Sequence, residues 1–138
     1  MSTSRGLREV AAGLVRRGGR LLVAQRRRGD THPLKWEFPG GTVRPGETTW
    51  EAVAREIREE LGLEVREAAY LGSCLDPPFR IHYHLADYVS GEVRLRAHEE
   101  ARWVEPRELL GLDLLPGDRV LVERLSLLMQ EGRGLTHV

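Results

Sequence analysis

The sequence predicts an α/β (α+β) fold with a mixed β-sheet, for three reasons. Short apolar runs typical of strands interleave with two segments of helical periodicity. A Gly-Gly pair between the first two of these runs indicates a β-hairpin. The chain has 138 residues, 41% of them hydrophobic, which is the size of one domain that buries its own core. We therefore expect residues 1–138 to form a single domain.

The expected strands are short and bounded by turn residues. Residues 10–15 and 21–25 flank the Gly18-Gly19 pair, and a polar loop follows at 26–33. A Pro-Gly-Gly turn at 39–41 interrupts the next run, residues 36–43. Further strands are expected at residues 65–73, 80–89 and 102–104, with a turn at 90–91.

The clearest helix signal covers residues 49–61. Thr48 and Glu51 form a capping-box pattern at its start, and Gly62 stands where a left-handed C-cap is expected. The apolar side chains at 50, 53, 54, 57 and 61 fall on one broad stripe suited to the core. A helical turn is expected at 106–110. A final amphipathic helix is expected at 116–129, with residues 120, 121, 125 and 128 on its apolar side.

Charge and cysteine content narrow the class of protein. Lys+Arg and Asp+Glu are both 21, and this zero net charge argues against a protein that binds nucleic-acid polymers. The single cysteine, Cys74, excludes an intramolecular disulfide and indicates a reducing, cytoplasmic compartment. No stretch approaches the roughly 20 apolar residues of a membrane span. We therefore expect a cytoplasmic enzyme or binding module that acts away from membranes. The sequence leaves open whether it is a monomer or a homodimer.

Three glutamates crowd one face of the expected helix at 49–61. Glu56, Glu59 and Glu60 stand at i, i+3 and i+4, a spacing at which like charges repel and weaken a helix. A divalent cation such as Mg²⁺, which prefers hard oxygen ligands, would compensate this repulsion. The alternative is a solvated acidic face balanced by Arg55 and Arg58.

A glycine-rich loop leads directly into the start of this helix. Gly40, Gly41 and Gly46 permit tight turns and a close approach of the backbone to a phosphate or an ion. The loop therefore favours the metal-binding interpretation of the three glutamates.

The segment from residue 41 to residue 63 resembles the Nudix box. That pattern is Gly, five residues, Glu, seven residues, Arg-Glu-aliphatic, one residue, Glu-Glu, one residue and Gly-aliphatic. Every specified position matches without a gap: Gly41, Glu47, Arg55, Glu56, Ile57, Glu59, Glu60, Gly62 and Leu63. Trp-Glu-Phe-Pro-Gly at 36–40, His-Glu-Glu-Ala-Arg-Trp at 98–103 and Leu-Pro-Gly-Asp at 115–118 are similar to the MutT-like branch of this family.

The resemblance implies an α/β/α sandwich that hydrolyses a nucleoside diphosphate linked to another moiety, by attack of metal-activated water on phosphorus. It implies that Glu59 and Glu60 bind Mg²⁺, with Mn²⁺ as an alternative, helped by the Gly41 carbonyl. Glu56 would be a metal ligand or the general base, and Arg55 would orient the glutamates.

The resemblance also implies structural roles in the motif for Glu47, Gly40 and Gly62. Many MutT-like enzymes have one more metal-binding acid beyond the box. Glu100 is the preferred candidate here and Glu99 the second. Ala97 occupies the place where much of the branch has a glutamate, so the alternative is that both acids are surface charges.

Four residues are candidates for contacting the substrate. Arg26 and Lys35 flank the glycine loop and could meet phosphates, although each could equally be an ordinary surface cation. Phe38 could line a base pocket or belong to the core. Asp118 matches the MutT-like position that contacts the nucleobase, and its alternative role is to start the last helix.

The leading function is a MutT-like pyrophosphohydrolase that converts a nucleoside triphosphate, oxidised nucleotides included, to a monophosphate and pyrophosphate. ADP-ribose, another nucleotide sugar or a dinucleoside polyphosphate is the alternative substrate, and Asp-Pro-Pro at 76–78 weakly resembles a marker of ADP-ribose hydrolases. A non-catalytic nucleotide sensor is the alternative of another class. The complete set of box acids favours the enzyme.

Overall fold

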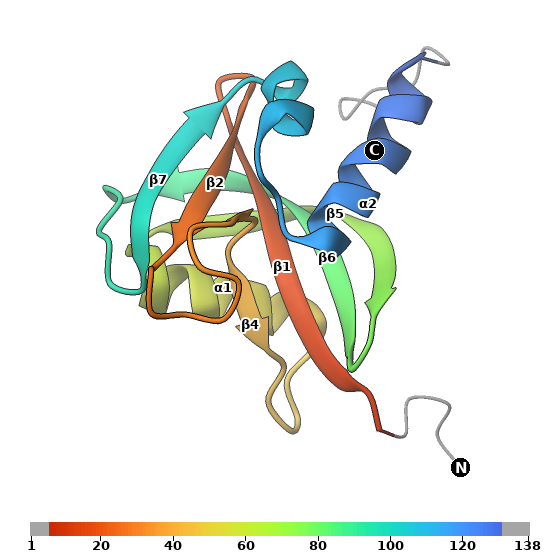
Figure 1. Cartoon of the computed structure of the whole chain (residues 1–138). Helices are drawn as coiled ribbons and strands as arrows, with labels where there is room; N and C mark the ends of the chain where they lie inside the picture. The colour runs from red at the N-terminus through yellow and green to blue at the C-terminus, as the bar shows by residue number, and fades with distance from the viewer. Residues whose placement is uncertain (1–5, 131–138) are drawn as a thin grey trace.

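The computed structural model describes residues 6–130, with side chains as far as residue 127. The elements follow one another along the chain as shown in Figure 1: β1 (Arg8–Arg17), β2 (Arg20–Arg26), β3 (Trp36–Glu37), β4 (Gly40–Thr42), α1 (Thr49–Leu61), β5 (Glu64–Asp76), β6 (Phe79–Ser90), β7 (His98–Val104), the 3₁₀ helix η1 (Pro106–Gly111) and α2 (Pro116–Gln130). No helix in this described part is long and apolar enough to cross a membrane.

The seven strands form one mixed sheet, as the sequence predicts. The order is β3-β2-β1-β6-β5, while β4 pairs with β1 and β7 pairs with β2. β1 and β6 run parallel, and the other pairs are antiparallel. The hairpin between β1 and β2 turns at Gly18 and Gly19, both at positive φ. Pairing of Val10, Ala11 and Ala12 with β4 places the glycine loop against the central strand.

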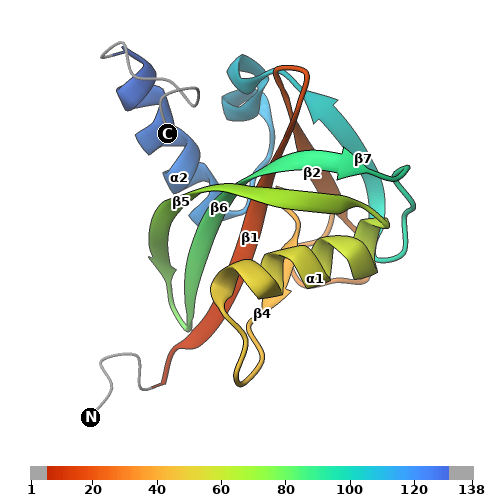
Figure 2. The same ribbon diagram turned by 180° about the vertical axis from the view of Figure 1, so that it is seen from behind.

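The sheet separates α1 from α2, which confirms the expected α/β/α sandwich (Figures 1 and 2). Because successive side chains of a strand point to opposite faces of the sheet, Leu14 lies in the core beneath α2 and Val15 in the core beneath α1. Helix α1 lies close to β1 at Gly13, where a Cβ would come within 2.8 Å of the Val53 side chain. This close packing fixes the helix that carries the glutamates relative to the glycine loop.

Helix α1 has the bounds and caps that the sequence predicts. The Thr48 hydroxyl accepts a hydrogen bond from the Glu51 amide at 3.0 Å, and the Glu51 carboxylate accepts one from the Thr48 amide at 2.8 Å. Gly62 ends the helix in the left-handed conformation with φ 73°. Ala52, Val53, Ile57 and Leu61 are buried, whereas Trp50 and Ala54 of the expected stripe are only partly buried.

Two expectations about the later elements are wrong. Strand β7 begins at His98 instead of residue 102, because its charged first half is held by backbone pairing with β2. Val120 on α2 is 41% exposed, whereas Leu121 and Val122 enter the core. The expected position of Leu128 lies outside the described side chains.

Candidate functional site

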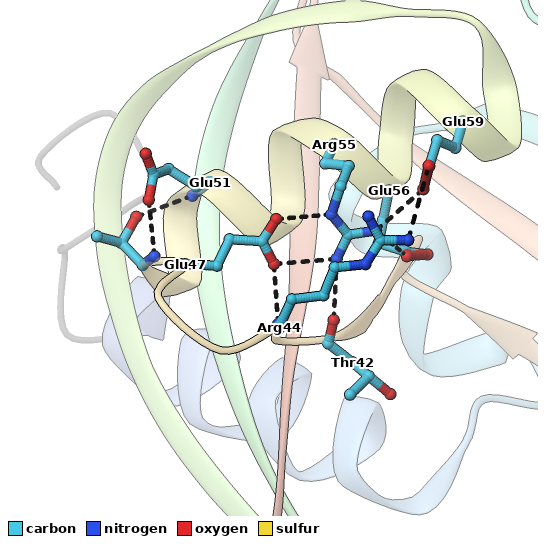
Figure 3. A network of polar contacts seen from close by, with 8 residues as sticks. Thr42, Arg44, Glu47, Glu51, Arg55, Glu56 and Glu59 are labelled. Atoms are coloured by element: carbon cyan, nitrogen blue, oxygen red, sulfur yellow. Dashed lines mark hydrogen bonds and ion pairs between the residues drawn. The ribbon is translucent and has the colours of Figure 1, made fainter.

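The Arg55 side chain connects the glycine loop to the acidic face of α1 (Figure 3). Its Nε and Nη2 donate to the two oxygens of Glu47 at 2.6 and 3.0 Å, and Nη2 also donates to the Thr42 carbonyl at 3.0 Å. Its Nη1 donates to Glu56 at 2.6 Å and to Glu59 at 2.9 Å. These contacts are what a residue that orients the glutamates requires.

Glu47 is the other fixed point of this network. Its carboxylate accepts the Arg55 guanidinium in a two-pronged pair and also accepts the Arg44 amide at 3.0 Å. Hydrogen bonding from Arg55 first, and from the Arg44 backbone second, lowers the pKa of Glu47 to about 2. The hydrogen bond with Glu47 in turn raises the pKa of Arg55. This charge pair holds the loop to the first half of α1.

Glu60 lies in a different environment from Glu59. Burial, then a hydrogen bond and repulsion from Glu56, and then repulsion from Glu37 raise the pKa of Glu60 to about 9. Its Oε1 is buried and has no hydrogen-bond partner among the described residues. A buried carboxyl group crowded by two other carboxylates is stabilised by a nearby cation, so this geometry fits a divalent metal ion.

The glycine loop lies directly against these carboxyl groups. A Cβ on Gly41 would come within 2.5 Å of Glu56 Oε2, and a Cβ on Gly40 would come within 2.0 Å of the Ala11 carbonyl oxygen. Only glycine fits this approach without displacing its neighbours. The backbone of Gly41 is therefore near the glutamates, as expected for a residue whose carbonyl helps to hold a metal.

The described residues contain no group of three His, Cys, Asp or Glu side chains already arranged to hold a metal ion. Glu56 and Glu59 each direct one oxygen towards Arg55. The donors that fit the ion are oxygens from Glu60, Glu56, Glu59 and the loop backbone. Mg²⁺ characteristically combines a few carboxylates with water and substrate phosphates, so it does not need a closed cage of side chains.

A cleft of about 420 Å³ adjoins these acids. Its lining combines Gly40, Gly41 and Glu60 with three of the expected substrate residues, Arg26, Phe38 and Asp118. The structure therefore brings residues from four separate segments of the chain to one concave site. Clefts of this size that combine apolar walls with a few polar groups are typical ligand sites.

Asp118 lies buried in the wall of this cleft. Its Oδ2 accepts the Phe38 amide at 3.0 Å, and its Oδ1 accepts the Tyr83 hydroxyl at 2.5 Å. Burial raises the pKa of Asp118 to about 7, although both hydrogen bonds favour the ionised form. Asp118 is also in the first turn of α2, so it combines the helix-start position with a place in the cleft. Phe38 likewise is both core and cleft wall.

Sequence reasoning missed a polar network that involves Glu37 and His98. Glu37 accepts Arg26 Nη1 at 2.9 Å and pairs with His98 Nε2 at 2.8 Å, and all three residues line the cleft. His98 is 4% exposed, and its Nδ1 has no partner among the described residues. The signal available in the sequence was a glutamate between two aromatic residues, Trp36 and Phe38, in a segment otherwise suited to a core strand.

Lys35, Glu99 and Glu100 lie away from the cleft lining. Lys35 Nζ forms an ion pair with Asp113 at 2.6 Å. Glu100 pairs with Arg102, and Glu99 is exposed where the register of β7 against β2 shifts. A substrate contact by Lys35 and a metal contact by either glutamate therefore stay predictions, without support from this arrangement.

Comparison with known proteins agrees with this site. A model of the NUDIX domain family matches residues 7–125. The chain belongs to the Nudix family. It is 41% identical over 122 residues to a Mycobacterium tuberculosis protein provisionally named 8-oxo-dGTP diphosphatase 2, covering 85% of this chain and 86% of that one. It is 35% identical over 120 residues to the CTP pyrophosphohydrolase of Escherichia coli, covering 83% and 88%.

The fold also matches solved Nudix structures. The crystal structure of a MutT NUDIX hydrolase from Burkholderia pseudomallei aligns with a TM-score of 0.73 at 30% identity, over 86% of this chain and 97% of that chain. These comparisons confirm the expected family, its MutT-like branch and the enzyme class, a Nudix pyrophosphohydrolase. Nudix hydrolases generally need a divalent metal, which agrees with the acidic site.

Proposed function

We propose that this Nudix protein is a Mg²⁺-dependent nucleoside triphosphate pyrophosphohydrolase that releases a nucleoside monophosphate and pyrophosphate. The observation that carries the proposal is the buried, unpartnered Glu60 oxygen at a cleft that also contains Arg26 and the Phe38–Asp118 wall. The names of the two relatives, which refer to 8-oxo-dGTP and CTP, support a triphosphate as the substrate.

The residues that would hold Mg²⁺ are Glu56, Glu59 and Glu60, with the Gly41 carbonyl and with Glu100 as the candidate for an additional ligand. Mn²⁺ suits the same oxygen donors. When bound, the ion neutralises charge on phosphate oxygens and lowers the pKa of a coordinated water.

The protein's own groups would position the reactants. Arg55 keeps the Glu56 and Glu59 carboxylates in place through hydrogen bonds of 2.6 and 2.9 Å. Arg26 would contact the phosphates from the cleft wall. A water oxygen forms the new bond to phosphorus while the bond to the bridging oxygen breaks, and Glu56 is our candidate to accept the water proton. The leaving group keeps the bridging oxygen, and the products are a nucleoside monophosphate and pyrophosphate.

The test is a hydrolysis panel at millimolar Mg²⁺ with products identified by chromatography. It includes standard and 8-oxo nucleoside triphosphates, ADP-ribose and a diadenosine polyphosphate. Glu59→Gln and Glu60→Gln remove charge from the candidate ligands. Glu64→Gln is the matched control, because Glu64 is an acid outside the cleft that pairs with Arg58.

Conversion of a triphosphate to monophosphate and pyrophosphate, abolished in the two site variants and retained in the control, supports the proposal. Cleavage of ADP-ribose or the dinucleotide alone overturns the proposed substrate. Absence of Mg²⁺-dependent turnover on every compound overturns the enzyme in favour of a nucleotide sensor.

We also propose that residues 1–138 act as one domain, monomeric or homodimeric, on free nucleotides in the cytoplasm. One continuous sheet with a core on each face supports a single domain. The free thiol of Cys74 supports a reducing compartment, and the balanced charge supports a small substrate instead of a polymer. Size-exclusion chromatography with light scattering measures the oligomeric state.

A further inference from the structure

The part of the cleft next to α2 has apolar walls and two aspartates. Phe79, Ile81 and Leu115 line it together with Phe38. Asp118 and Asp76 add carboxyl groups to these walls. A flat, apolar ring with polar groups on its edge, such as a nucleobase, suits such a lining.

Asp118 uses its hydrogen-bonding capacity largely within the protein. One oxygen accepts the Phe38 amide and the other accepts the Tyr83 hydroxyl. The residue is 3% exposed, so little of it reaches the open part of the cleft. Asp118 therefore acts mainly as a positioning residue that holds the Phe38 backbone and the Tyr83 ring.

Asp76 is placed differently. It is the last residue of β5, it is only partly buried, and it lines the cleft. Among the described residues, neither of its carboxylate oxygens forms a hydrogen bond or an ion pair. Both oxygens are therefore available to a ligand.

The start of α2 packs closely against the wall of the cleft beside Asp76. A Cβ built on Gly117 would lie 3.8 Å from Asp76 Cβ, 3.3 Å from the Tyr83 hydroxyl oxygen and 2.8 Å from the Ile81 side chain. Asp76, Tyr83 and Ile81 thus surround one point next to Asp118. A side chain at position 117 would clash with Ile81, so glycine allows α2 to approach this wall and brings Asp118 close to Asp76.

We propose that Asp76 is a specificity-determining residue that accepts a hydrogen bond from an exocyclic amine of the substrate's base. A carboxylate accepts hydrogen bonds only, so it favours a base that presents N–H groups and disfavours one that presents a carbonyl oxygen at the same place. The substrate class is then a nucleoside triphosphate with an amino-substituted base. This inference rests on the proposed function and adds the base preference to it.

The experiment compares nucleotides that differ by the amine. CTP carries an amino group where UTP carries a carbonyl, and GTP carries an amino group that ITP lacks. The wild-type protein, Asp76→Ala and Asp76→Asn are measured with both pairs. Asp113→Ala is the control, because Asp113 has a largely exposed side chain outside the cleft lining.

We expect the wild-type protein to prefer the amine-bearing member of at least one pair. Loss of one charge-assisted hydrogen bond should lower that preference in kcat/KM by about tenfold or more in Asp76→Ala. The turnover of ITP should stay within about twofold, because ITP does not use the contact, whereas that of UTP should rise, because repulsion of its carbonyl oxygen is removed. Asp76→Asn keeps one acceptor and adds a donor, so its preference should be intermediate. Asp113→Ala should match the wild type.

Binding of the product separates this inference from the proposed function. The Kd values of CMP, UMP, GMP and IMP are measured by calorimetry without metal, on the same four proteins. If the wild type binds the amine-bearing monophosphates more tightly and Asp76→Ala loses this preference, the inference is supported. Absence of triphosphate hydrolysis in the same proteins would overturn only the proposed function. Equal selectivity in the wild type and Asp76→Ala, or no amine preference in the wild type, overturns the role of Asp76.

Discussion

The substitution Asp118→Asn tests the electrostatics of the cleft through the stability of the protein. Asparagine has nearly the same shape as aspartate and keeps an oxygen that accepts the Phe38 amide, which lies 3.0 Å from the carboxylate. It cannot ionise. Any effect of Asp118 ionisation on folding should therefore disappear in this variant, while the packing of the site changes little.

The size of the effect follows from the pKa. Burial raises the pKa of Asp118 from its ordinary 3.8 to about 7. Each unit of difference between folded and unfolded chain corresponds to about 1.4 kcal/mol, so ionising the buried carboxyl costs up to about 4 kcal/mol. Between these two pKa values the folded chain keeps a proton that the unfolded chain has released. The free energy of unfolding contributed by Asp118 is therefore highest below 3.8 and falls as the pH rises through about 7.

Urea unfolding at a series of pH values from about 4 to about 8 measures this difference. We expect the free energy of unfolding of Asp118→Asn, relative to wild type, to rise by about 2–4 kcal/mol across that range. Other titrating groups cancel in the comparison, and a lost hydrogen bond to Tyr83 shifts all points equally. A difference that does not change with pH would refute the raised pKa of Asp118.

Three further substitutions test the site. Gly41→Ala places a Cβ within 2.5 Å of Glu56 Oε2. We expect it to lower kcat about 100-fold by displacing that carboxylate, while a melting curve stays close to that of the wild type. Arg55→Lys cannot form the two-pronged contact with Glu47, so kcat/KM should fall at least about tenfold and Mg²⁺ titrations should show weaker binding. Lys35→Ala removes an ion pair outside the cleft, and kcat/KM should stay within about twofold of wild type. A larger loss would indicate that Lys35 contacts the substrate.

Local signals explain which parts of the fold are predictable from the sequence. Helix α1 matches residue for residue because Thr48, Glu51 and Gly62 specify both ends through contacts within the helix. The first half of β7 has no apolar alternation, and its strand conformation comes from pairing with β2, which is distant in sequence. The exposure of Val120 depends on how α2 packs beneath the sheet, which periodicity alone does not determine.

The candidate site also contains some residues whose place the sequence predicts and others whose place it does not. The acidic residues and Gly41 follow from spacing, because the box lies on one loop and one helix. The contact between Glu37 and His98 joins residues 61 positions apart and exists only because β2 pairs with β3 on one side and β7 on the other. Lys35 follows Leu34, whose φ of 62° belongs to an unusual loop conformation. The Lys35 side chain forms an ion pair with Asp113. Nothing in the sequence alone specifies that direction.

Glu37 lies between the part of the cleft at Glu60 and the part around Asp118. Repulsion from its carboxylate contributes to the raised pKa of both Glu60 and Asp118. Arg26 and His98 hold that carboxylate through contacts of 2.9 and 2.8 Å, so its position between the two acids is fixed. A phosphate that draws Arg26 away from Glu37 would strengthen the repulsion at both acids, and a cation beside Glu60 would weaken it there. In the proposed enzyme, binding of a metal at Glu60 and of a phosphate at Arg26 would therefore each change the free energy of protonating Asp118, through the charge of Glu37.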